Sequence, residues 1–254
     1  GVQTCALPIW ARVAAELDED VGFARRGIVW LAETEAQLAA REAWLATARP
    51  FQIDTRILSA AETGAMLARG DRGVAGAVAT PSDATAEPRL AVPAVARRAR
   101  ALGATILEGC AVRALDVAGG RLRGVVTERG LIACDAAVLA GGAWSRTFLE
   151  NCGVALPQLA VLASAQRTGP APEILPGGVG ADAASLRRRA DGGYTVAKAG
   201  AATFDLIPAA FRHLRAFLPL AAGNARMIRL KLSRGFVGPL GRRRWEADEA
   251  SPFE

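Results

Sequence analysis

The sequence of 254 residues contains little histidine, cysteine or aromatic side chain. His213 is its single histidine, which argues against a Ser-His-Asp hydrolase and against a histidine-rich metal site. Besides Cys5 there are three cysteines and no Cys-x-x-Cys spacing, so we predict no metal site, no disulfide framework and a reducing compartment. No apolar run approaches about 18 residues and no signal peptide is visible, so no integral membrane segment is predicted.

Positive charge is in excess, but it is scattered along the chain. The sequence has 31 Lys and Arg against 25 Asp and Glu, a net charge of +6. Because the basic residues form no stripe and aromatic residues are scarce, binding of nucleic acid is not predicted. The densest basic groups, Arg187 to Arg189 and Arg242 to Arg244, are predicted to be solvated loops, with a phosphate-binding patch as the alternative.

The most informative stretch runs from Asp135 to Arg146. Ala136 to Ala140 is a short apolar run, which predicts a strand buried on both faces of a parallel sheet. Gly141 and Gly142 then allow a sharp turn, and Ser145 is a candidate N-cap for a helix that ends near Gly153. A strand, a glycine turn and a helix N-terminus together favour an anionic cofactor, and a simple tight turn is the alternative.

The residues before this stretch predict a helix followed by a meander. We expect a helix from Pro93 to Leu102, stopped by Gly103, and a strand over Thr105 to Leu107. Three further strands are expected in an antiparallel arrangement, over 110–117, 122–127 and 131–134. Flavoproteins with two dinucleotide-binding domains use such a meander as a crossover connection in place of a helix.

Several short motifs follow one another in a fixed order and spacing between about Thr80 and Pro157, namely 87–95, 102–106, 110–115, 124–130, 138–145 and 153–157. Through these motifs the segment resembles the D-amino-acid oxidase and dehydrogenase superfamily of FAD-dependent amine oxidoreductases. It is most similar to the bacterial D-amino-acid dehydrogenase, glycine oxidase and sarcosine oxidase branch. The resemblance implies FAD as cofactor and assigns five residues to its binding, Val112, Ala140, Gly141, Gly142 and Trp144.

The resemblance also implies an α/β fold with two domains. Residues 80–157 would form a partial FAD-binding, Rossmann-like domain with a β-meander, and 10–79 and 158–254 an α+β substrate domain with an antiparallel sheet. Strands are expected over 23–31, 158–167 and 193–197, with helices over 33–46, from the Ser59 capping box and over 208–217. Tyr194 lies in that sheet and is a candidate substrate-side residue, with core packing as the alternative.

The family opens with a strand and a Gly-x-Gly-x-x-Gly turn for the FAD pyrophosphate, which this sequence lacks. The relaxed match over Gly178 to Ala183 follows a proline and is predicted to be a loop. Residues 1–9 resemble a translated sequencing adapter, so little local order is expected there. Because Trp245 to Glu254 resembles an internal stretch of relatives, we expect a fragment cut at both ends.

The resemblance implies oxidation of the C–N bond of an amino acid, either a D-amino acid or an N-substituted glycine, to an imine and then a keto acid. We expect the fragment alone to be inactive. No catalytic residue is assigned, and the electron acceptor stays open. A cytoplasmic protein is predicted, with a peripheral position at the inner membrane as an alternative. The main rival interpretation is a non-catalytic binding or structural module of an α/β nucleotide-binding protein.

Overall fold

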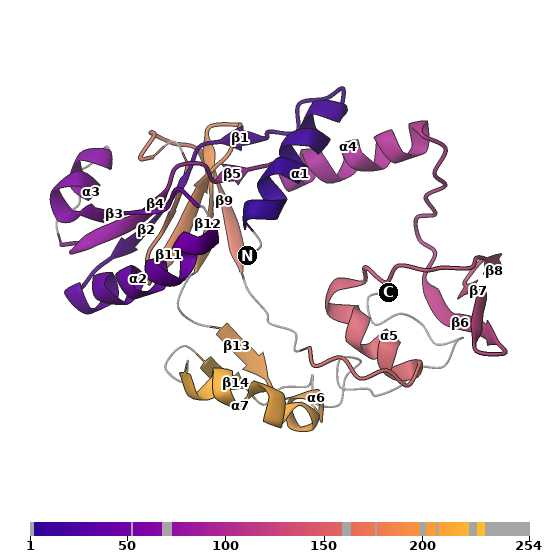
Figure 1. Ribbon diagram of the computed structural model, residues 1–254. Coiled ribbons are helices and arrows are strands. Elements are labelled where there is room, and N and C mark those ends of the chain that lie inside the picture. The colour runs from indigo at the N-terminus through magenta and orange to yellow at the C-terminus, as the bar shows by residue number, and fades with distance from the viewer. Residues whose placement is uncertain are drawn as a thin grey trace. The chain divides into compact units, whose positions relative to one another are not determined.

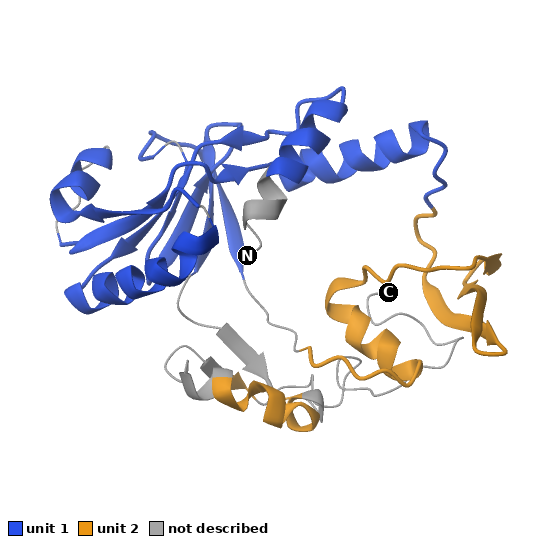
Figure 2. Cartoon of the chain, in the orientation of Figure 1, with its two compact units in different colours: residues 1–106, 164–200 blue, residues 107–163, 201–254 orange. Residues whose placement is uncertain are grey.

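The computed structural model describes residues 3–51, 53–67, 73–158, 164–175, 177–198, 202–206, 208–223 and 228–231 (Figure 1). The chain divides into two compact units, each made of two stretches (Figure 2). The first unit comprises residues 1–106 and 164–200, and the second comprises 107–163 and 201–254. The sequence predicts domain boundaries after residues 79 and 157. The contacts instead divide the chain after residues 106, 163 and 200.

A seven-stranded sheet forms the centre of the first unit, in the order β3-β4-β2-β10-β11-β12-β9. Only β2 and β10 are parallel, and all other neighbours are antiparallel. Its strands are β2 Ile28–Ala32, β3 Arg56–Ser59, β4 Gly76–Thr80, β9 Ala165–Pro170, β10 Gly178–Gly180, β11 Ala184–Arg188 and β12 Gly193–Lys198. Both flanks of the predicted cofactor segment therefore contribute to one mostly antiparallel sheet, as an α+β arrangement requires.

Capping boxes start the two helices that contact this sheet, and the one at Ser59 is where the sequence predicts it. Helix α3, Ala60–Met66, begins with a capping box in which the Ser59 hydroxyl accepts from the Glu62 N–H at 3.2 Å. The Glu62 carboxylate in turn accepts from the Ser59 N–H at 2.8 Å, and this bond lowers the pKa of Glu62. Helix α2, Glu35–Ala48, has the same motif and is followed by the 3₁₀ turn η1, Arg49–Phe51.

The main hydrophobic core lies on one face of this sheet. Its buried members come from three strands and from the segment before β10, and they are Val29, Leu58, Ala77, Ala79 and Leu175. Leu31, Leu67 and Val179 pack against them. Val29 and Val179 are register partners in the parallel β2–β10 pair, so the core extends across that pair.

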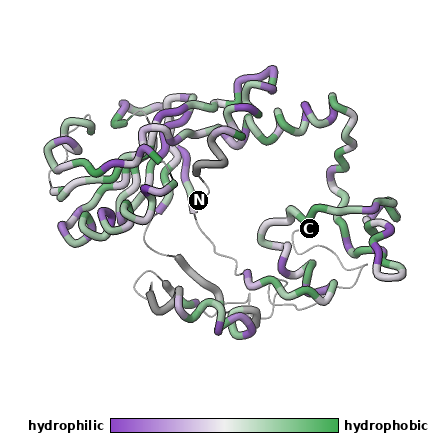
Figure 3. The backbone as a smooth tube through the Cα atoms, in the orientation of Figure 1, coloured by the Kyte–Doolittle hydropathy of each residue, from purple (hydrophilic) through white to green (hydrophobic). Residues whose placement is uncertain are grey.

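A second core joins α1, Gln3–Glu16, to α4, Pro88–Ala101. It contains Leu17, Val21, Ala91 and Ala94, and Figure 3 shows both polar and apolar positions along α4. Ala91 and Ala94 are three positions apart and lie on one face of the helix, as in an amphipathic helix. Helix α4 begins at Pro88, earlier than predicted, because a proline needs no N–H partner in a first helical turn. Its end is as predicted, since Gly103 adopts a positive φ of 95°.

Helix α1 contradicts the expectation of little order in residues 1–9, because it begins at Gln3. Its anchoring contacts come from Val13 and Ala14, which pack against the second core, so the helix extends back from an anchored end. Ile9 remains 51% exposed, whereas the side chain of Leu7 lies outside the described residues. The order of this segment therefore comes from helix continuation and not from burial of Ile9.

Three of four predicted strands differ from the structure. Residues 23–31 form two strands, β1 Ala24–Arg25 and β2, because Gly27 breaks the run with a φ of 71°. Of the strand predicted over 158–167, only β9 from Ala165 onward is a described strand, and 159–163 lie outside the described residues. Residues 105–107 form no strand. Strand β12 over Gly193–Lys198 confirms the remaining prediction, and β1 pairs with β5, Ala84–Thr85.

Strand β10 replaces the loop predicted at Gly178. A Cβ atom at Gly180 would lie 2.3 Å from the ring of Trp30, and one at Gly177 would lie 2.1 Å from the carbonyl oxygen of Gly27. The glycines are therefore present because β10 is packed tightly against β2, and not because the chain turns there. The glycine-rich pattern predicts a loop because the residues that explain the glycines lie about 150 positions away in the sequence.

The arginine cluster 187–189 is also not a solvated loop. Arg187 lies in β11 and forms an ion pair with Glu87 at 3.0 Å. Arg188 donates to the hydroxyl of Tyr194 at 3.1 Å, and Arg189 is only 5% exposed. The guanidinium groups can be buried because each has a carboxylate, hydroxyl or carbonyl partner. The second cluster, Arg242 to Arg244, lies outside the described residues, as does the segment from Trp245 to Glu254.

The second unit contains the predicted meander. Strands β6 Val112–Ala118, β7 Arg121–Thr127 and β8 Gly130–Ala133 form an antiparallel sheet. Gly119 and Gly120 connect the first two with φ values of 59° and 74°, the conformation of a tight hairpin turn. The unit also contains η2 Gly142–Trp144, α5 Ser145–Asn151, α6 Pro208–Arg212, α7 Leu214–Gly223 and the parallel pair β13 Ala202–Asp205 and β14 Ile228–Lys231.

The helix predicted over 208–217 is interrupted, and His213 lies between α6 and α7. Its ring nitrogen Nε2 lies 3.6 Å from a carboxylate oxygen of Glu150, so the histidine is a boundary residue beside α5. Among the helices of the described part of the chain, none is both long and apolar enough to cross a membrane.

Candidate functional site

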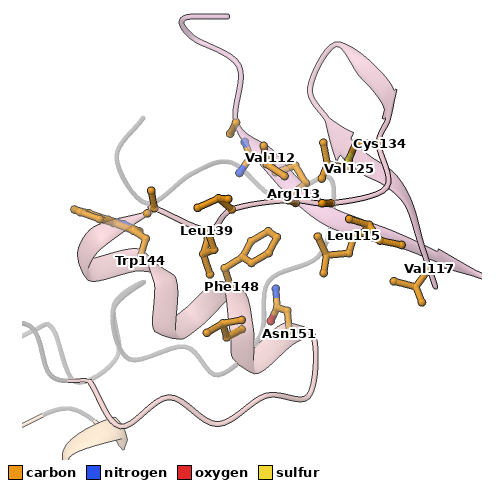
Figure 4. A pocket seen from close by; sticks show the side chains of 18 of the residues that line it. Val112, Arg113, Leu115, Val117, Val125, Cys134, Leu139, Trp144, Phe148 and Asn151 are labelled. Carbon is orange, nitrogen blue, oxygen red and sulfur yellow. The ribbon is translucent and has the colours of Figure 1, made fainter. Parts of the chain in front are cut away.

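Four of the five predicted cofactor residues line one cavity in the second unit (Figure 4). The cavity has a volume of about 830 Å³. Val112 contributes from β6, Ala140 and Gly141 from the segment before η2, and Trp144 from η2 itself. Gly142 follows Gly141 directly but is not among the lining residues. The structure thus brings together residues that are up to 32 positions apart in the sequence.

The walls of this cavity come from a strand face and a helical stripe. Alternate residues of β6, including Arg113, Leu115 and Val117, line one side. Phe148 and Asn151 line the other, and with Trp144 they follow the helical spacing i, i+4, i+7. The sequence prediction missed these wall residues. Two sequence signals identify them: the alternation of lining residues along β6, and the i, i+4, i+7 spacing of the lining residues from Trp144 into α5.

The segment from Ala136 to Ala140 is not the buried parallel strand predicted for it. It has no regular secondary structure, and Val138 is 94% exposed. No described strand pairs with it, because β8 pairs only with β7 and the meander ends there. A parallel strand needs neighbours that satisfy its backbone N–H and C=O groups, and the described residues supply none. The apolar run therefore lies extended along the edge of the cavity.

The glycine turn is held by local hydrogen bonds. The N–H of Trp144 donates to the Gly141 carbonyl at 3.1 Å, and the side-chain amide of Gln158 donates to the Gly142 carbonyl at 3.1 Å. Gly142 has a φ of 55°, a conformation that favours glycine. Gln158 was predicted to begin a strand, and its role in fixing the turn leaves no pattern in the sequence.

The helix after the turn is confirmed, but its cap is not. Helix α5 ends at Asn151, and Gly153 follows with a φ of 76°, as predicted. Ser145 is the first helical residue and not the N-cap, because Trp144 occupies that position without a side-chain cap hydrogen bond. The preceding 3₁₀ turn shifts the start of the helix by one residue.

The charged groups around the cavity are paired with one another. Arg113 is the one cationic side chain among the described lining residues, and it forms an ion pair with Glu128. Glu128 also accepts from the Ala111 N–H at 3.0 Å. On α5, the nearly buried Arg146 and Glu150 form an ion pair at 3.0 Å. The lining is therefore mostly apolar, which suits an aromatic ring system better than a pyrophosphate group.

Tyr194 lies in the first unit and is 4% exposed. Its hydroxyl accepts from the Ile174 N–H at 2.9 Å and from Arg188 at 3.1 Å, and it donates to the Pro172 carbonyl at 3.2 Å. These three partners use the hydrogen-bonding capacity of the phenol. The geometry favours the packing interpretation over direct contact with a substrate.

No cluster of three or more potential metal ligands occurs among the residues that the structure describes. A mixed α/β chain whose meander and glycine turn enclose an apolar cavity has the features of a nucleotide-cofactor protein. The family model described as FAD dependent oxidoreductase matches residues 3–238, and the chain belongs to this family. The predicted family and its dependence on FAD are thus confirmed.

Two relatives show which proteins the chain resembles. It is 34% identical to a D-amino acid dehydrogenase of Rhizobium rhizogenes over 157 residues, which cover 58% of this chain and 38% of the relative. It also resembles the structure of an L-amino acid deaminase from Proteus myxofaciens in complex with anthranilate, with 30% identity and a TM-score of 0.85. That match covers 98% of this chain and 57% of the deaminase. The chain therefore spans well under two thirds of each relative.

Proposed function

We propose that the protein containing this chain oxidises the C–N bond of an amino acid with the help of FAD. The substrate class is a D-amino acid or an N-substituted glycine, and the imine formed hydrolyses to an oxo acid and an amine or ammonia. The observation that carries the proposal is the single cavity shared by Val112, Ala140, Gly141 and Trp144, in a chain of the FAD dependent oxidoreductase family.

The cavity residues supply binding and shielding. When bound, FAD would supply the oxidising power, as the acceptor of one hydride equivalent from the substrate carbon, while the amine nitrogen loses one proton to give the imine. Gly141 has no Cβ, so a ring can approach the backbone of the turn closely. Trp144 and Phe148 offer aromatic surfaces that exclude water, and Val112 presents β6 to the cavity. The Gln158 hydrogen bond fixes the turn that carries these groups.

On the substrate side we assign Tyr194 a positioning role, in which its hydroxyl holds the segment between Pro172 and Ile174 against β12. A contact between Tyr194 and the substrate stays a prediction. A cytoplasmic location, or a peripheral one at the inner membrane, also stays a prediction. The identity of the electron acceptor stays open.

The first test uses the intact gene product that contains these 254 residues. We expect it to purify yellow and to lose its flavin colour anaerobically when a D-amino acid or an N-methyl amino acid is added. L-amino acids are included as a separate arm. Flavin that no amino acid reduces contradicts the proposal, and a protein without flavin favours a binding or structural module.

The second test places a charge in the cavity. A Cβ at Gly141 would make only ordinary contacts, the nearest at 3.4 Å from the Ser145 hydroxyl, so substitution is sterically tolerated. Gly141→Asp should weaken FAD binding about tenfold or more, because a carboxylate would face an anionic cofactor in an apolar cavity. Gly141→Asn is the matched control of equal size. Equal affinities for FAD in both variants would place the cofactor elsewhere.

The 254-residue chain by itself is expected to bind FAD weakly. Its sequence contains no strand followed by Gly-x-Gly-x-x-Gly, the turn that grips the pyrophosphate. Quenching of flavin fluorescence on titration with the purified chain measures this directly. Tight binding by the chain alone would show that the cavity residues suffice.

A further inference from the structure

A second cavity of about 520 Å³ lies within the first unit, between the β11–β12 turn and the beginning of α4. Its volume is in the range typical of small-molecule sites. Unlike the cavity of the second unit, its lining is dominated by charged side chains. They are Glu87, Arg89, Arg167, Arg187, Arg189 and Asp191.

The charges of this cavity do not balance. Four guanidinium groups face two carboxylates, which leaves an excess of two positive charges. Asp191 is shared by Arg189 at 2.8 Å and Arg167 at 3.0 Å, and the hydrogen bond from Arg189 lowers the pKa of Asp191 to about 2. Glu87 is bound by Arg187 at 3.0 Å. Both carboxylates are thus already engaged, whereas Arg89 makes no ion pair within the described part of the chain.

Two of the four arginines that line the cavity, Arg187 and Arg189, are held in place by backbone carbonyls. Arg187 donates to the Ala86 carbonyl at 3.3 Å, and Arg189 donates to the Thr168 carbonyl at 2.9 Å. Such bonds keep the guanidinium groups from turning toward solvent and lower the entropy lost when an anion binds. Helix α4 begins at the cavity without an acidic residue in its first turn, and Glu87 makes no side-chain cap bond to it. The positive end of the helix therefore adds to the field of the arginines.

We propose that this cavity binds a small dianionic oxyanion, the chemistry shared by a phosphate monoester and a dicarboxylate. Two negative charges match the excess of two positive charges. The exposed side chains of Arg89 and Arg167 form the open part of the site and supply planar, bidentate donors for the ligand. This inference does not rest on the proposed flavin cavity, because none of the residues involved lines that cavity.

Isothermal titration of the purified chain at constant ionic strength tests the site, with inorganic phosphate as one probe and malonate as the other. Arg89→Gln and Arg167→Gln should each weaken binding of the preferred probe about tenfold, as expected for loss of one charge-assisted interaction. Tighter binding of phosphate supports a phosphorylated ligand, and tighter binding of malonate supports a dicarboxylate.

Arg98→Gln is the matched control, because Arg98 lies in the last turn of α4, is exposed and does not line the cavity. It changes the net charge by the same amount and should leave both affinities unchanged. Binding of neither probe, or equal weakening by Arg98→Gln, overturns the proposal. Circular dichroism confirms that each variant is folded before it is titrated.

Discussion

The sheet of the first unit and the glycine-turn segment of the second unit place polar and apolar residues in opposite environments. Arg189 is 5% exposed, with hydrogen bonds to backbone carbonyls and to Asp191. Val138 is apolar and 94% exposed, and no described strand covers its segment. Burial in this chain therefore follows the presence of bonding and packing partners, and not the polarity of the residue alone.

The strongest test of this comparison removes the buried guanidinium. Arg189→Ala should lower the free energy of unfolding by about 3 kcal/mol, because the carbonyls of Thr168 and Tyr194 lose a donor inside the protein. Urea denaturation measures the loss. Arg167→Ala is the control, since its exposed pair with Asp191 should contribute less than about 1 kcal/mol. Equal losses in both variants would contradict the difference in environment.

A smaller loss of stability is expected where the residue before β10 meets the residues before β2. A Cβ at Gly177 would lie 2.1 Å from the Gly27 carbonyl oxygen and 2.3 Å from that of Arg26, and backbone atoms cannot move aside cheaply. Gly177→Ala should therefore lower the free energy of unfolding by about 1–3 kcal/mol. Gly169→Ala, where a Cβ meets nothing within 4 Å, is the control and should be close to neutral.

The ion pairs of Asp191 should make the free energy of unfolding depend on pH in the acid range. Its pKa is lowered from about 3.9 in an unfolded chain to about 2, chiefly by the hydrogen bond from Arg189. The group therefore stabilises the fold above about pH 4, and this contribution disappears as the pH falls toward 2. Asp191→Asn should flatten that part of an acid unfolding curve. The exposed Asp18, changed to Asn, is the control, and an identical curve for both variants would contradict the assignment.

The smallest effect is expected at the exposed apolar segment. Val138→Ser should change the free energy of unfolding of the 254-residue chain by less than about 0.5 kcal/mol, since the side chain is 94% exposed. Val125→Ser, in the meander, is the contrasting variant because Val125 is partly buried in β7 and lines the cavity. A loss above about 1 kcal/mol at Val138 would mean that the segment is covered in solution.

Local patterns predicted those elements whose partners lie close in the sequence. The Ser59 and Glu62 capping box spans four residues, and the Gly119 and Gly120 turn joins adjacent strands. Four of the five residues proposed for the cofactor also line one cavity, although that assignment came from a family resemblance and not from periodicity.

Predictions failed where the residues that determine the local structure are distant in the sequence. The glycines of β10 are explained by Trp30 and Gly27, and the buried arginines by Glu87 and by carbonyls of another strand. The segment from Ala136 to Ala140 reads as a buried strand because its composition is apolar, but composition does not show whether a neighbouring strand is present. The helical start at Gln3 likewise depends on the core that anchors the far end of α1.

The parallel pairing of β2 with β10 has a consequence for how the chain folds during synthesis. Ile28 meets Gly178, about 150 positions later, and residues 107–163 between them belong to the other unit. A ribosome must therefore translate β10 before β2 can acquire its second neighbour, and closing so long a loop costs more conformational entropy than forming a hairpin. Until then β2 exposes an unpaired edge, so nascent chains that end before β10 should be the species that chaperones retain and that aggregate most readily.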